Sequence, residues 1–396
     1  MSISRSDRSK LAEWWFTVDH VLIVAIAILM LSGIVLSLAA SPAVAIKKGL
    51  PTFFFFERHI IFSFAGFATM IVLSFFGPLM VRKLALGLLL VATAALVWVL
   101  FDSSVINGAR RWISLGGVSL QPSESVKPAF VVIVAWLLAE ARNRPDMPAL
   151  PLAAGVGLLV CGLVVLQPDV GQTALLAVTW GAMYLLAGLP IIGVAVLAGL
   201  GVSGIFAAYW FFPHVQGRID RFFSATLEAN SQVSRAIDSF VQGGFLGRGP
   251  GEGTIKTRFP DAHTDFIFSV IAEEYGVIAC LALAFLIGFI VVKAMISTLR
   301  EPRLANRLAV QGLALMFGLQ AFVNMGVNVG LLPATGMTLP YISAGGSSML
   351  AISVGLGMLL ALSRRRADLA NYETTRFTAR QAVMGEVDAF SRHGQN

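Results

Sequence analysis

Long apolar runs recur along nearly the whole chain, and they constrain its fold more than any other feature. Each is close to the length of about 20 residues that a helix needs to cross the hydrocarbon layer of a membrane. They lie at residues 17–39, 59–78, 84–101, 123–141, 151–166, 172–188, 190–212, 266–292, 309–331 and 347–363. We interpret the break at residues 188–190 as a tight turn between two spans. The sequence therefore predicts an all-α polytopic membrane protein with ten transmembrane helices.

Composition supports this fold class. Of the 396 residues, 57% are hydrophobic and only 13% are charged, about half the charged fraction of a typical soluble protein. The net charge of +7 does not indicate a nucleic-acid partner, because the basic residues form short clusters between apolar runs. Cys161 and Cys280 each lie inside an apolar run, which argues against a disulfide framework or a thiol metal site.

The distribution of basic residues orients the chain. With a cytoplasmic N-terminus, the clusters at 82–83, 142–144, 293–307 and 364–366 all fall on the cytoplasmic side, as the positive-inside rule requires. The chain then divides into a cytoplasmic N-terminal segment at 1–16, a ten-span membrane domain at 17–363 and a cytoplasmic tail at 364–396.

The outer loop at 213–264 is too long for a simple connector, so it is expected to be structured or functional. Apolar residues recur on one face of residues 233–241, which predicts an amphipathic helix on the outer membrane surface. Residues 247–256 are glycine-rich but lack the ending of a phosphate-binding loop, so we interpret them as a flexible hinge. Most basic residues of the loop, Lys256 among them, are expected to pair with its own acids on a wet surface.

Several polar side chains fall inside or at the ends of apolar runs, where they need partners. Glu124 and Lys127 are one helical turn apart and are predicted to neutralise each other. Asn324 and Asn328 share one helix face, which favours hydrogen bonding between helices. At least one of the carboxylates at 273–274 is expected to face a water-filled cavity or a basic partner.

Two outer segments have the composition of anion-binding sites. Arg110-Arg111-Trp112 combines two guanidinium groups with an aromatic ring, which suits a phosphate group at the membrane surface. Residues 340–348 offer small hydroxyl side chains and backbone N–H groups ahead of a predicted helix start, and a helix N-terminus favours anions.

Asp265 lies where the long polar loop gives way to an apolar run. In the simplest interpretation, Thr264 or Asp265 is the N-cap of the following helix. In a second, Asp265 takes a proton from a sugar hydroxyl, or holds a divalent cation such as Mg²⁺ or Mn²⁺ that acidifies this hydroxyl. An ionised aspartate is a weak base at its ordinary pKa, so the sequence leaves both chemical roles open.

If the ten spans form a bundle, the candidate residues of the outer side meet around one cavity that is open to water and to lipid. They are Arg110, Arg111, Gln121, Asp169, His263, Asp265 and residues 343–348. Such a cavity suits a substrate with a phosphate head, a polar body and a lipid tail.

Five motifs between residues 107 and 348 resemble, in order, those of the SEDS family (shape, elongation, division, sporulation) of bacterial cell-wall polymerases. They are Asn107–Trp112, Gln121–Glu124 with Lys127, Gln167–Asp169, Phe259–Phe268 with Glu273-Glu274, and Pro340–Ser348. Residues 260–263 are more similar to the division-type members than to the elongation-type members. The chain departs from residues common in the family at Ser125, Gln172, Tyr341 and Ala344.

The resemblance implies a ten-span enzyme that polymerises lipid II into glycan strands by an inverting transfer, with undecaprenyl pyrophosphate as the leaving group. It also implies that Asp265 is the essential carboxylate of the outer loop. The implied substrate-binding residues are Arg110, Arg111, Trp112, Gln121, Ser123, Glu124, Lys127, Asp169, His263, Thr264, Ser343, Gly345, Gly346, Ser347 and Ser348.

The same resemblance implies a location and partners. The location is the bacterial cytoplasmic (inner) membrane at the division septum. The partners are a class B penicillin-binding protein, which cross-links the strands as the division transpeptidase, and other membrane proteins of the division complex.

Two alternative functions fit the same membrane bundle. A lipid II flippase predicts charged groups along a path through the bilayer and an internal repeat, whereas no clear repeat is present and the polar residues concentrate on one side. A non-enzymatic scaffold would recruit division proteins through its helices and through the tail at 364–396, which mixes charged and apolar residues. The sequence does not exclude a scaffold.

Overall fold

The computed structural model describes residues 9–101, 111–115, 118–144, 146–211, 216–217, 220, 232–258 and 262–365. They belong to two units, a large one at His20–Ser363 and a small one formed by the residues on either side of it. In the small unit, helix α1 (Lys10–Thr17) carries Glu13, whose Oε1 lies 3.1 Å from Arg364 Nη2. This ion pair joins the two terminal segments of the chain.

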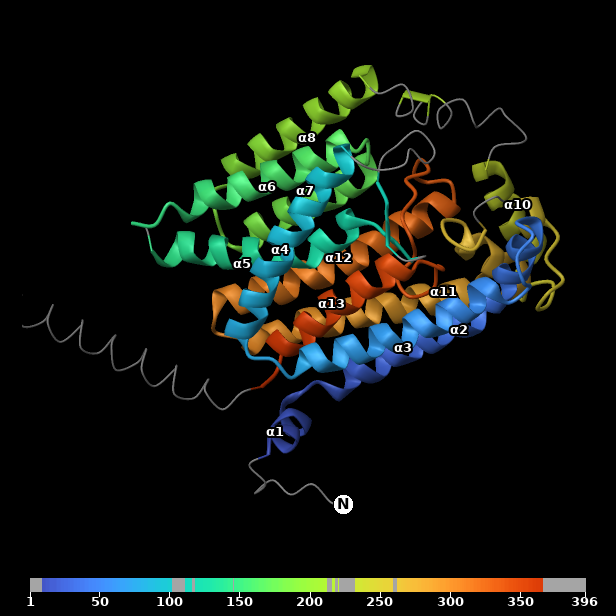
Figure 1. The fold of residues 1–396 in the computed structure, drawn as a ribbon, viewed down its shortest axis with the longest axis horizontal. Coiled ribbons are helices and arrows are strands. Elements are labelled where there is room, and N and C mark those ends of the chain that lie inside the picture. Colours follow the sequence, from blue (N-terminus) through green and yellow to red (C-terminus); the bar gives the residue numbers. More distant parts are fainter. Residues whose placement is uncertain are drawn as a thin grey trace, which may run out of the picture. The chain divides into compact units, whose positions relative to one another are not determined.

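The large unit is a bundle of long helices, most of them apolar (Figure 1). They are α2 (His20–Lys47), α3 (Phe54–Ser74), α4 (Pro78–Phe101), α5 (Pro122–Asn143), α6 (Ala149–Leu166), α7 (Val170–Leu186), α8 (Ile191–Phe211), α11 (Ile267–Ser297), α12 (Leu304–Asn328) and α13 (Gly346–Leu362). Each apolar run of the sequence overlaps one of these helices. Within the described part of the chain, seven helices are long and apolar enough to cross a membrane. The predicted all-α membrane fold is confirmed, whereas the count of ten spans stays a prediction.

Local residue choices account for several helix ends. Helices α4 and α5 begin at Pro78 and Pro122, and proline fits a first helical position because the N–H group there has no helical partner. Helix α7 ends just before Gly188, whose φ of 69° is accessible to glycine at little cost. The predicted turn between α7 and α8 is therefore confirmed.

The interior of the large unit is built around α5, α12 and α13 (Figure 1). Helix α13 packs against α3, α5 and α12, and α5 also packs against α4, α6 and α7. Most of α5 is buried although it carries charged residues, whereas none of the most apolar stretch of α8 is buried. As a consequence, α5 places its polar side chains at the centre of the bundle.

A short hairpin leads into α5. Strands β1 (Ile113–Leu115) and β2 (Val118–Leu120) pair antiparallel, with Ser114 opposite Ser119. The hairpin ends one residue before Gln121, the N-cap of α5. The connection between α4 and α5 therefore contains a structured element, which the sequence analysis did not anticipate.

Helix α11 is interrupted at Gly276, whose φ of 79° and ψ of 175° strongly favour glycine. At the interruption, the N–H groups of residues 277–278 bond to the carbonyls of 244–245 at 3.0 and 3.3 Å. The carbonyls of 273–274 accept in turn from the N–H groups of 248–249 at 2.9 and 3.0 Å. The segment at residues 244–249 thus supplies the hydrogen bonds that α11 loses at Gly276. Such replacement is needed because a break inside an apolar helix leaves backbone groups that no water can reach.

This segment lies between α10 (Gln232–Gly243) and the 3₁₀ helix η1 (Ile255–Arg258), and side chains of α11 hold it further. The Glu273 carboxylate accepts from the backbone N–H groups of residues 254–256 at 2.6, 2.8 and 3.2 Å. Glu274 Oε1 lies 2.5 Å from the buried Lys256 Nζ. The basic partner expected for these carboxylates is confirmed. The interpretation of residues 247–256 as a flexible hinge is wrong, because hydrogen bonds tie this segment to α11. The expected pairing of Lys256 with an acid of its own loop is also wrong, because Lys256 pairs with Glu274 of α11.

Candidate active site

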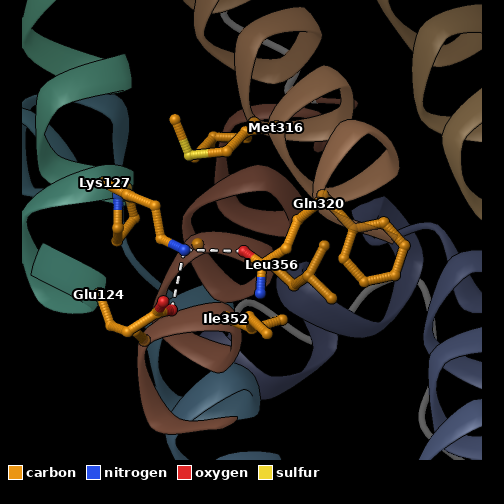
Figure 2. A pocket seen from close by; sticks show the side chains of 11 residues that line it. Glu124, Lys127, Met316, Gln320, Ile352 and Leu356 are labelled. Atoms are coloured by element: carbon orange, nitrogen blue, oxygen red, sulfur yellow. Dashed lines mark hydrogen bonds and ion pairs between the residues drawn. The ribbon is translucent and has the colours of Figure 1, made fainter. Parts of the chain in front are cut away.

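Glu124 and Lys127 form a buried ion pair at the start of α5 (Figure 2). Lys127 Nζ lies 2.8 Å from Glu124 Oε2, and each side chain is only 3% exposed. The ammonium group also donates to Gln320 Oε1 at 2.7 Å and to Gln172 Oε1 at 3.1 Å. The Lys127 ammonium group thus has three oxygen atoms within 3.1 Å. The predicted neutralisation is confirmed.

A small cavity adjoins this pair between α5, α12 and α13 (Figure 2). Its volume is about 30 Å³, and apolar side chains such as Met316, Ile352 and Leu356 form most of its wall. This is room for about one or two water molecules, whereas a drug-sized ligand needs a pocket of roughly 300–1,000 Å³. The cavity is therefore a water-sized space beside the ion pair.

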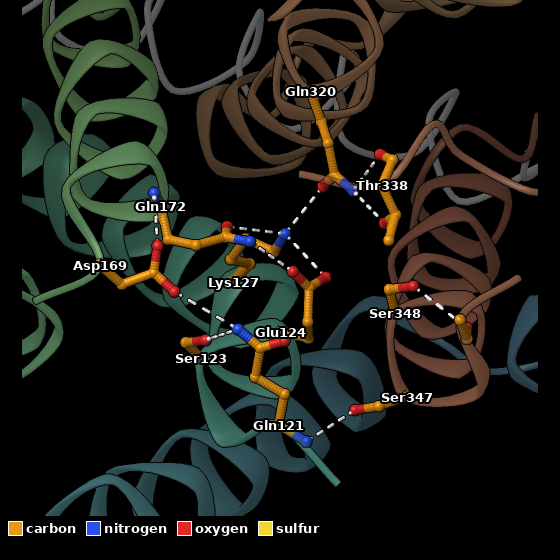
Figure 3. A network of polar contacts seen from close by, with 11 residues as sticks. Gln121, Ser123, Glu124, Lys127, Asp169, Gln172, Gln320, Thr338, Ser347 and Ser348 are labelled. Atoms are coloured by element: carbon orange, nitrogen blue, oxygen red, sulfur yellow. Dashed lines mark hydrogen bonds and ion pairs between the residues drawn. The ribbon is translucent and has the colours of Figure 1, made fainter. Parts of the chain in front are cut away.

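Gln172 links the pair to Asp169, the N-cap of α7 (Figure 3). Gln172 Nε2 donates to Glu124 Oε1 at 2.5 Å, and its backbone N–H donates to Asp169 Oδ1 at 3.4 Å. Arg111 Nη1 lies 3.5 Å from Asp169 Oδ2. Burial raises the pKa of Asp169, although the positive charge of Arg111 acts in the opposite direction. The site thus contains a second buried carboxylate with a cationic partner.

Backbone carbonyls also anchor the Arg111 side chain. Its Nε donates to Gln167 O at 3.0 Å, and its Nη2 donates to Pro168 O. Both carbonyls lie at the C-terminal end of α6, where the helix dipole favours a cation. Trp112 beside it is half-buried, and Arg110 lies outside the described residues. Phosphate binding by this motif stays a prediction.

Gln121 extends the contacts to the start of α13 (Figure 3). Its Nε2 donates to Ser123 Oγ at 3.0 Å and to Asp169 Oδ2 at 3.4 Å. Its backbone N–H donates to Ser347 Oγ at 3.0 Å. We call the residues joined in this way the ion-pair network; they are Arg111, Gln121, Ser123, Glu124, Lys127, Asp169, Gln172, Gln320 and Ser347.

The N-terminus of α13 begins where the sequence predicted it, with Gly345 as the N-cap and Gly346 as the first helical residue. A Cβ atom at Gly346 would lie 2.6 Å from the ring of Phe62 on α3, so a larger residue here would force this ring to move. Ser348 Oγ donates to the carbonyl of Gly345 at 3.1 Å. Anion binding at this helix start stays a prediction.

Asp265 lies in a short loop before α11 (residues 262–266, the Asp265 loop). Its side chain is half-buried. A Cβ atom at Gly336 would lie 3.8 Å from Asp265 Oδ2, and Gly336 belongs to the segment between α12 and α13 (residues 329–345, the C-terminal loop). The carboxylate therefore lies beside the C-terminal loop, which comes from a distant part of the sequence.

Hydrogen bonds from the C-terminal loop and from α12 fix three successive backbone carbonyls of the Asp265 loop. His263 O accepts from the Ala344 N–H at 2.8 Å, and Thr264 O accepts from Ser343 Oγ at 2.6 Å. Asp265 O accepts from two side-chain amides of α12, at 2.9 and 3.1 Å. The backbone on either side of the Asp265 carboxylate is thus held by two other elements.

The first turn of α11 is not capped by the Asp265 loop in the way the sequence suggested. Its N-cap is Phe266, which makes no side-chain capping bond. Asn328 Oδ1, from α12, accepts from the backbone N–H of Ser269 at 3.0 Å. The interpretation of Thr264 or Asp265 as the N-cap is therefore wrong, because an amide of another helix supplies an acceptor to this turn.

His263 is buried at the edge of the same loop. The centroids of its ring and the Phe55 ring are 4.4 Å apart. Burial lowers the pKa of His263 to about 4, and the charge of Lys48 acts in the same direction. His263 is therefore neutral near pH 7.

The structure thus gathers most of the predicted site residues into two clusters, the ion-pair network and the Asp265 loop with Ser343, whereas Trp112, Gly345, Gly346 and Ser348 belong to neither. Sequence reasoning missed two residues that connect these clusters, Gln320 and Thr338. Gln320 Nε2 donates to the carbonyl and the hydroxyl of Thr338 at 3.2 and 3.3 Å (Figure 3). A signal was present, since Gln320, Asn324 and Asn328 recur at every fourth position of one helix.

Comparisons with known proteins agree with this geometry. The family model FtsW/RodA/SpoVE, described as "Cell cycle protein", matches residues 19–368. A relative from Caulobacter vibrioides, named probable peptidoglycan glycosyltransferase FtsW, is 40% identical over 92% of this chain and 94% of its own. A Bacillus subtilis relative with the same name is 34% identical over 87% of this chain and 90% of its own.

Solved structures give the same result. A chain of a peptidoglycan synthase complex, whose structure concerns the coordination of polymerization and crosslinking, has a TM-score of 0.72 and 30% identity over 87% of this chain and 97% of its own. The rod shape determining protein RodA of Thermus thermophilus has a TM-score of 0.64 and 29% identity over 88% of this chain and 97% of its own. The resemblance to the SEDS family is confirmed, and the chain belongs to the FtsW/RodA/SpoVE family of cell cycle proteins.

Proposed function

We propose that this protein is a peptidoglycan glycosyltransferase that polymerises lipid II into glycan strands for the septal cell wall. The observation that carries the proposal is the match of 40% identity, over 92% of the chain, to a relative named for this activity. The helices on which the candidate residues lie fall within the matched residues 19–368. Enzymatic function is thus supported across the whole site rather than by one motif.

In the proposed reaction, Asp265 takes the proton of the acceptor 4-hydroxyl. The hydroxyl oxygen forms a bond to the anomeric carbon of the donor sugar while the bond from that carbon to the pyrophosphate oxygen breaks. Undecaprenyl pyrophosphate leaves with the electron pair of this bond, and the configuration inverts. A half-buried carboxylate on a fixed backbone suits this role, because general-base catalysis depends on the position of the base.

Cations at the outer face would stabilise the leaving pyrophosphate. Arg111 is the described candidate, since its guanidinium is held beside Asp169 near the start of α5. A Mg²⁺ or Mn²⁺ ion also fits, because such ions often bind through one or two carboxylates and the substrate's own phosphates. Asp265 would be its protein ligand and would then orient an acidified hydroxyl rather than remove the proton itself.

The proposed membrane arrangement has ten spans, with the loop at 213–264 on the outer side of the cytoplasmic membrane. The segments at 1–16 and 364–396 are cytoplasmic, and the domain at 17–363 carries the site. Among the described residues, seven apolar helices of sufficient length and the shorter apolar α7 and α13 support this arrangement. Helix α5 would be the tenth span, with its charges facing the interior of the bundle.

The proposed partners are a class B penicillin-binding protein, which cross-links the new strands, and other membrane proteins of the division complex at the septum. The similarity to a chain of a peptidoglycan synthase complex, in which polymerization and crosslinking are coordinated, supports a cross-linking partner.

Reconstitution in liposomes tests the proposed function. The purified protein, with its penicillin-binding partner and fluorescent lipid II, is expected to produce glycan strands that a muramidase digests. A parallel assay follows the movement of lipid II between leaflets. Lipid movement without strands would favour the flippase, and neither activity, with normal recruitment of division proteins in cells, would favour the scaffold.

A further inference from the structure

Helix α12 carries three buried amide side chains in one line, Gln320, Asn324 and Asn328, which we call the polar stripe. They are 2%, 1% and 0% exposed. A buried amide destabilises an apolar bundle unless its donors and acceptors are paired. The partners of the stripe therefore show what it does.

Asn324 and Asn328 converge on Asp265. Asn324 Nδ2 donates one hydrogen bond to Asp265 O at 3.1 Å and another to Met337 O in the C-terminal loop at 2.6 Å. Asn328 Nδ2 donates to the same Asp265 oxygen at 2.9 Å. One carbonyl thus accepts from two amides, and Asn324 joins the Asp265 loop to the C-terminal loop.

Asn328 also holds the first turn of α11, which follows the Asp265 loop. Its Oδ1 accepts from both the backbone N–H and the hydroxyl of Ser269, at 3.0 and 2.7 Å. Its Nδ2 also bonds to the carbonyl of Asn324 at 2.9 Å. With these contacts Asn328 uses the full capacity of its amide. The first turn of α11 and the Asp265 carbonyl are therefore held by one side chain.

Gln320 connects the stripe to the ion-pair network. Its Oε1 accepts from Lys127 at 2.7 Å, and its Nε2 donates to Thr338 in the C-terminal loop. Successive members of the stripe are four residues apart, so they lie one above the other on the helix. The buried pair in α5 and the Asp265 loop thus share one rigid support.

We infer that Asn324 and Asn328 are positioning residues that hold the Asp265 carboxylate at the reacting sugar, with Gln320 anchoring their helix to Lys127. They act through the backbone of Asp265 and do not touch the substrate. This inference rests on the proposed function and on the catalytic role of Asp265. A displacement of about 1 Å at a reacting group can lower a rate by roughly 100-fold.

The test compares Asn324→Leu and Asn328→Leu with Asn306→Leu in the reconstituted polymerase with its penicillin-binding partner and lipid II. Asn306 is a matched control, because it is a buried asparagine of α12 whose amide bonds to Glu301 at 3.2 Å, away from Asp265. We expect kcat to fall about 10- to 100-fold in the first two variants, with KM for lipid II within about threefold. Amide exchange at residues 265–269 should accelerate in these variants and not in Asn306→Leu.

Several outcomes would overturn the inference. They are an unchanged kcat in both stripe variants, a higher KM with normal kcat, or an equal loss of kcat in Asn306→Leu. If the leucine variants do not fold, Asn324→Ser and Asn328→Ser replace them, with the same expected direction and a smaller loss. Asp265→Asn is measured in the same assay. Full activity of this variant would contradict the proposed role of Asp265. Loss of its activity, together with full activity of the stripe variants, would contradict only the inference about Asn324 and Asn328.

Discussion

The ion-pair network and the Asp265 loop differ in the contacts that hold their charged residues. In the ion-pair network the side chains themselves are in contact, and the Lys127 ammonium group lies within 3.1 Å of oxygen atoms of three other residues. In the Asp265 loop the backbone is bonded, because three successive carbonyls accept hydrogen bonds from other elements. The Asp265 side chain is half-buried, whereas Glu124 and Lys127 are almost fully enclosed.

This difference separates two uses of a charge in a membrane bundle. A charge whose side chain is saturated by protein partners stabilises the packing around it and has little capacity left for a ligand. A carboxylate whose backbone is fixed while its side chain lies at the edge of the core is prepared for chemistry. We therefore expect changes at Glu124 or Lys127 to lower stability first, and changes at Asp265 to lower activity first.

The largest predicted loss of stability follows from Lys127→Met. Removing one partner of a buried ion pair leaves the other charge uncompensated, which costs about 3–5 kcal/mol of unfolding free energy. The double variant Glu124→Gln/Lys127→Met should recover part of this loss, because neither residue of the pair then carries a charge. Unfolding in detergent measures both.

A more exposed ion pair at the C-terminal end of the same helix provides the control. Arg144 Nε lies 3.5 Å from Glu140 Oε2, and the arginine side chain is 69% exposed. Arg144→Met should cost only about 0.2–1 kcal/mol. An equal cost for Lys127→Met and Arg144→Met would contradict a stabilising role of the buried pair.

A smaller effect is expected from the pH dependence of His263. The pKa of His263 is about 4 in the folded protein, below the ordinary value of 6.5. Between pH 6.5 and pH 4, His263 is therefore protonated in the unfolded chain and neutral in the folded protein. Stability should therefore fall as the pH is lowered from 6.5 to 4, by up to about 3 kcal/mol. In His263→Phe this part of the pH dependence should be absent. Identical pH profiles of unfolding in the two proteins would show that His263 is not held neutral by burial.

The last prediction concerns Glu273, whose effect is expected to be confined to one segment. Glu273→Ala leaves three backbone N–H groups without their acceptor, at a cost of about 1–3 kcal/mol for each group that stays buried and unpaired, and less where water replaces the carboxylate. Amide exchange at residues 254–256 should accelerate. The exposed Glu252 of the same segment supplies the control Glu252→Ala, which should change little. Unchanged exchange in Glu273→Ala would mean that the carboxylate does not hold this segment.

Much of this arrangement was predictable because it depends on local patterns. Apolar length indicated each long helix, and the spacing of Glu124 and Lys127 indicated their ion pair. The partners of Asp265 were not predictable in this way, because Asn324 and Ser343 are distant from it in the sequence. A polar stripe can be recognised from its spacing, but spacing alone does not reveal which backbone the amides hold.

The segment at 244–258 shows a second limit. Its glycines are typical of a hinge, and five glycines between 244 and 276 do have positive φ values. The structure uses these conformations to complete the hydrogen bonds of an interrupted helix. Composition indicates where backbone freedom is needed, but it does not distinguish a moving segment from a tightly bonded one.

The most direct test of the central claim measures polymerisation and stability together in Asp265→Asn. With the penicillin-binding partner and lipid II, the rate of strand formation should fall by about 10²- to 10⁴-fold, the usual contribution of a general base. The unfolding temperature should stay close to that of the unmodified protein. A normal rate would contradict the account, as would a large loss of stability that by itself explains the lost activity.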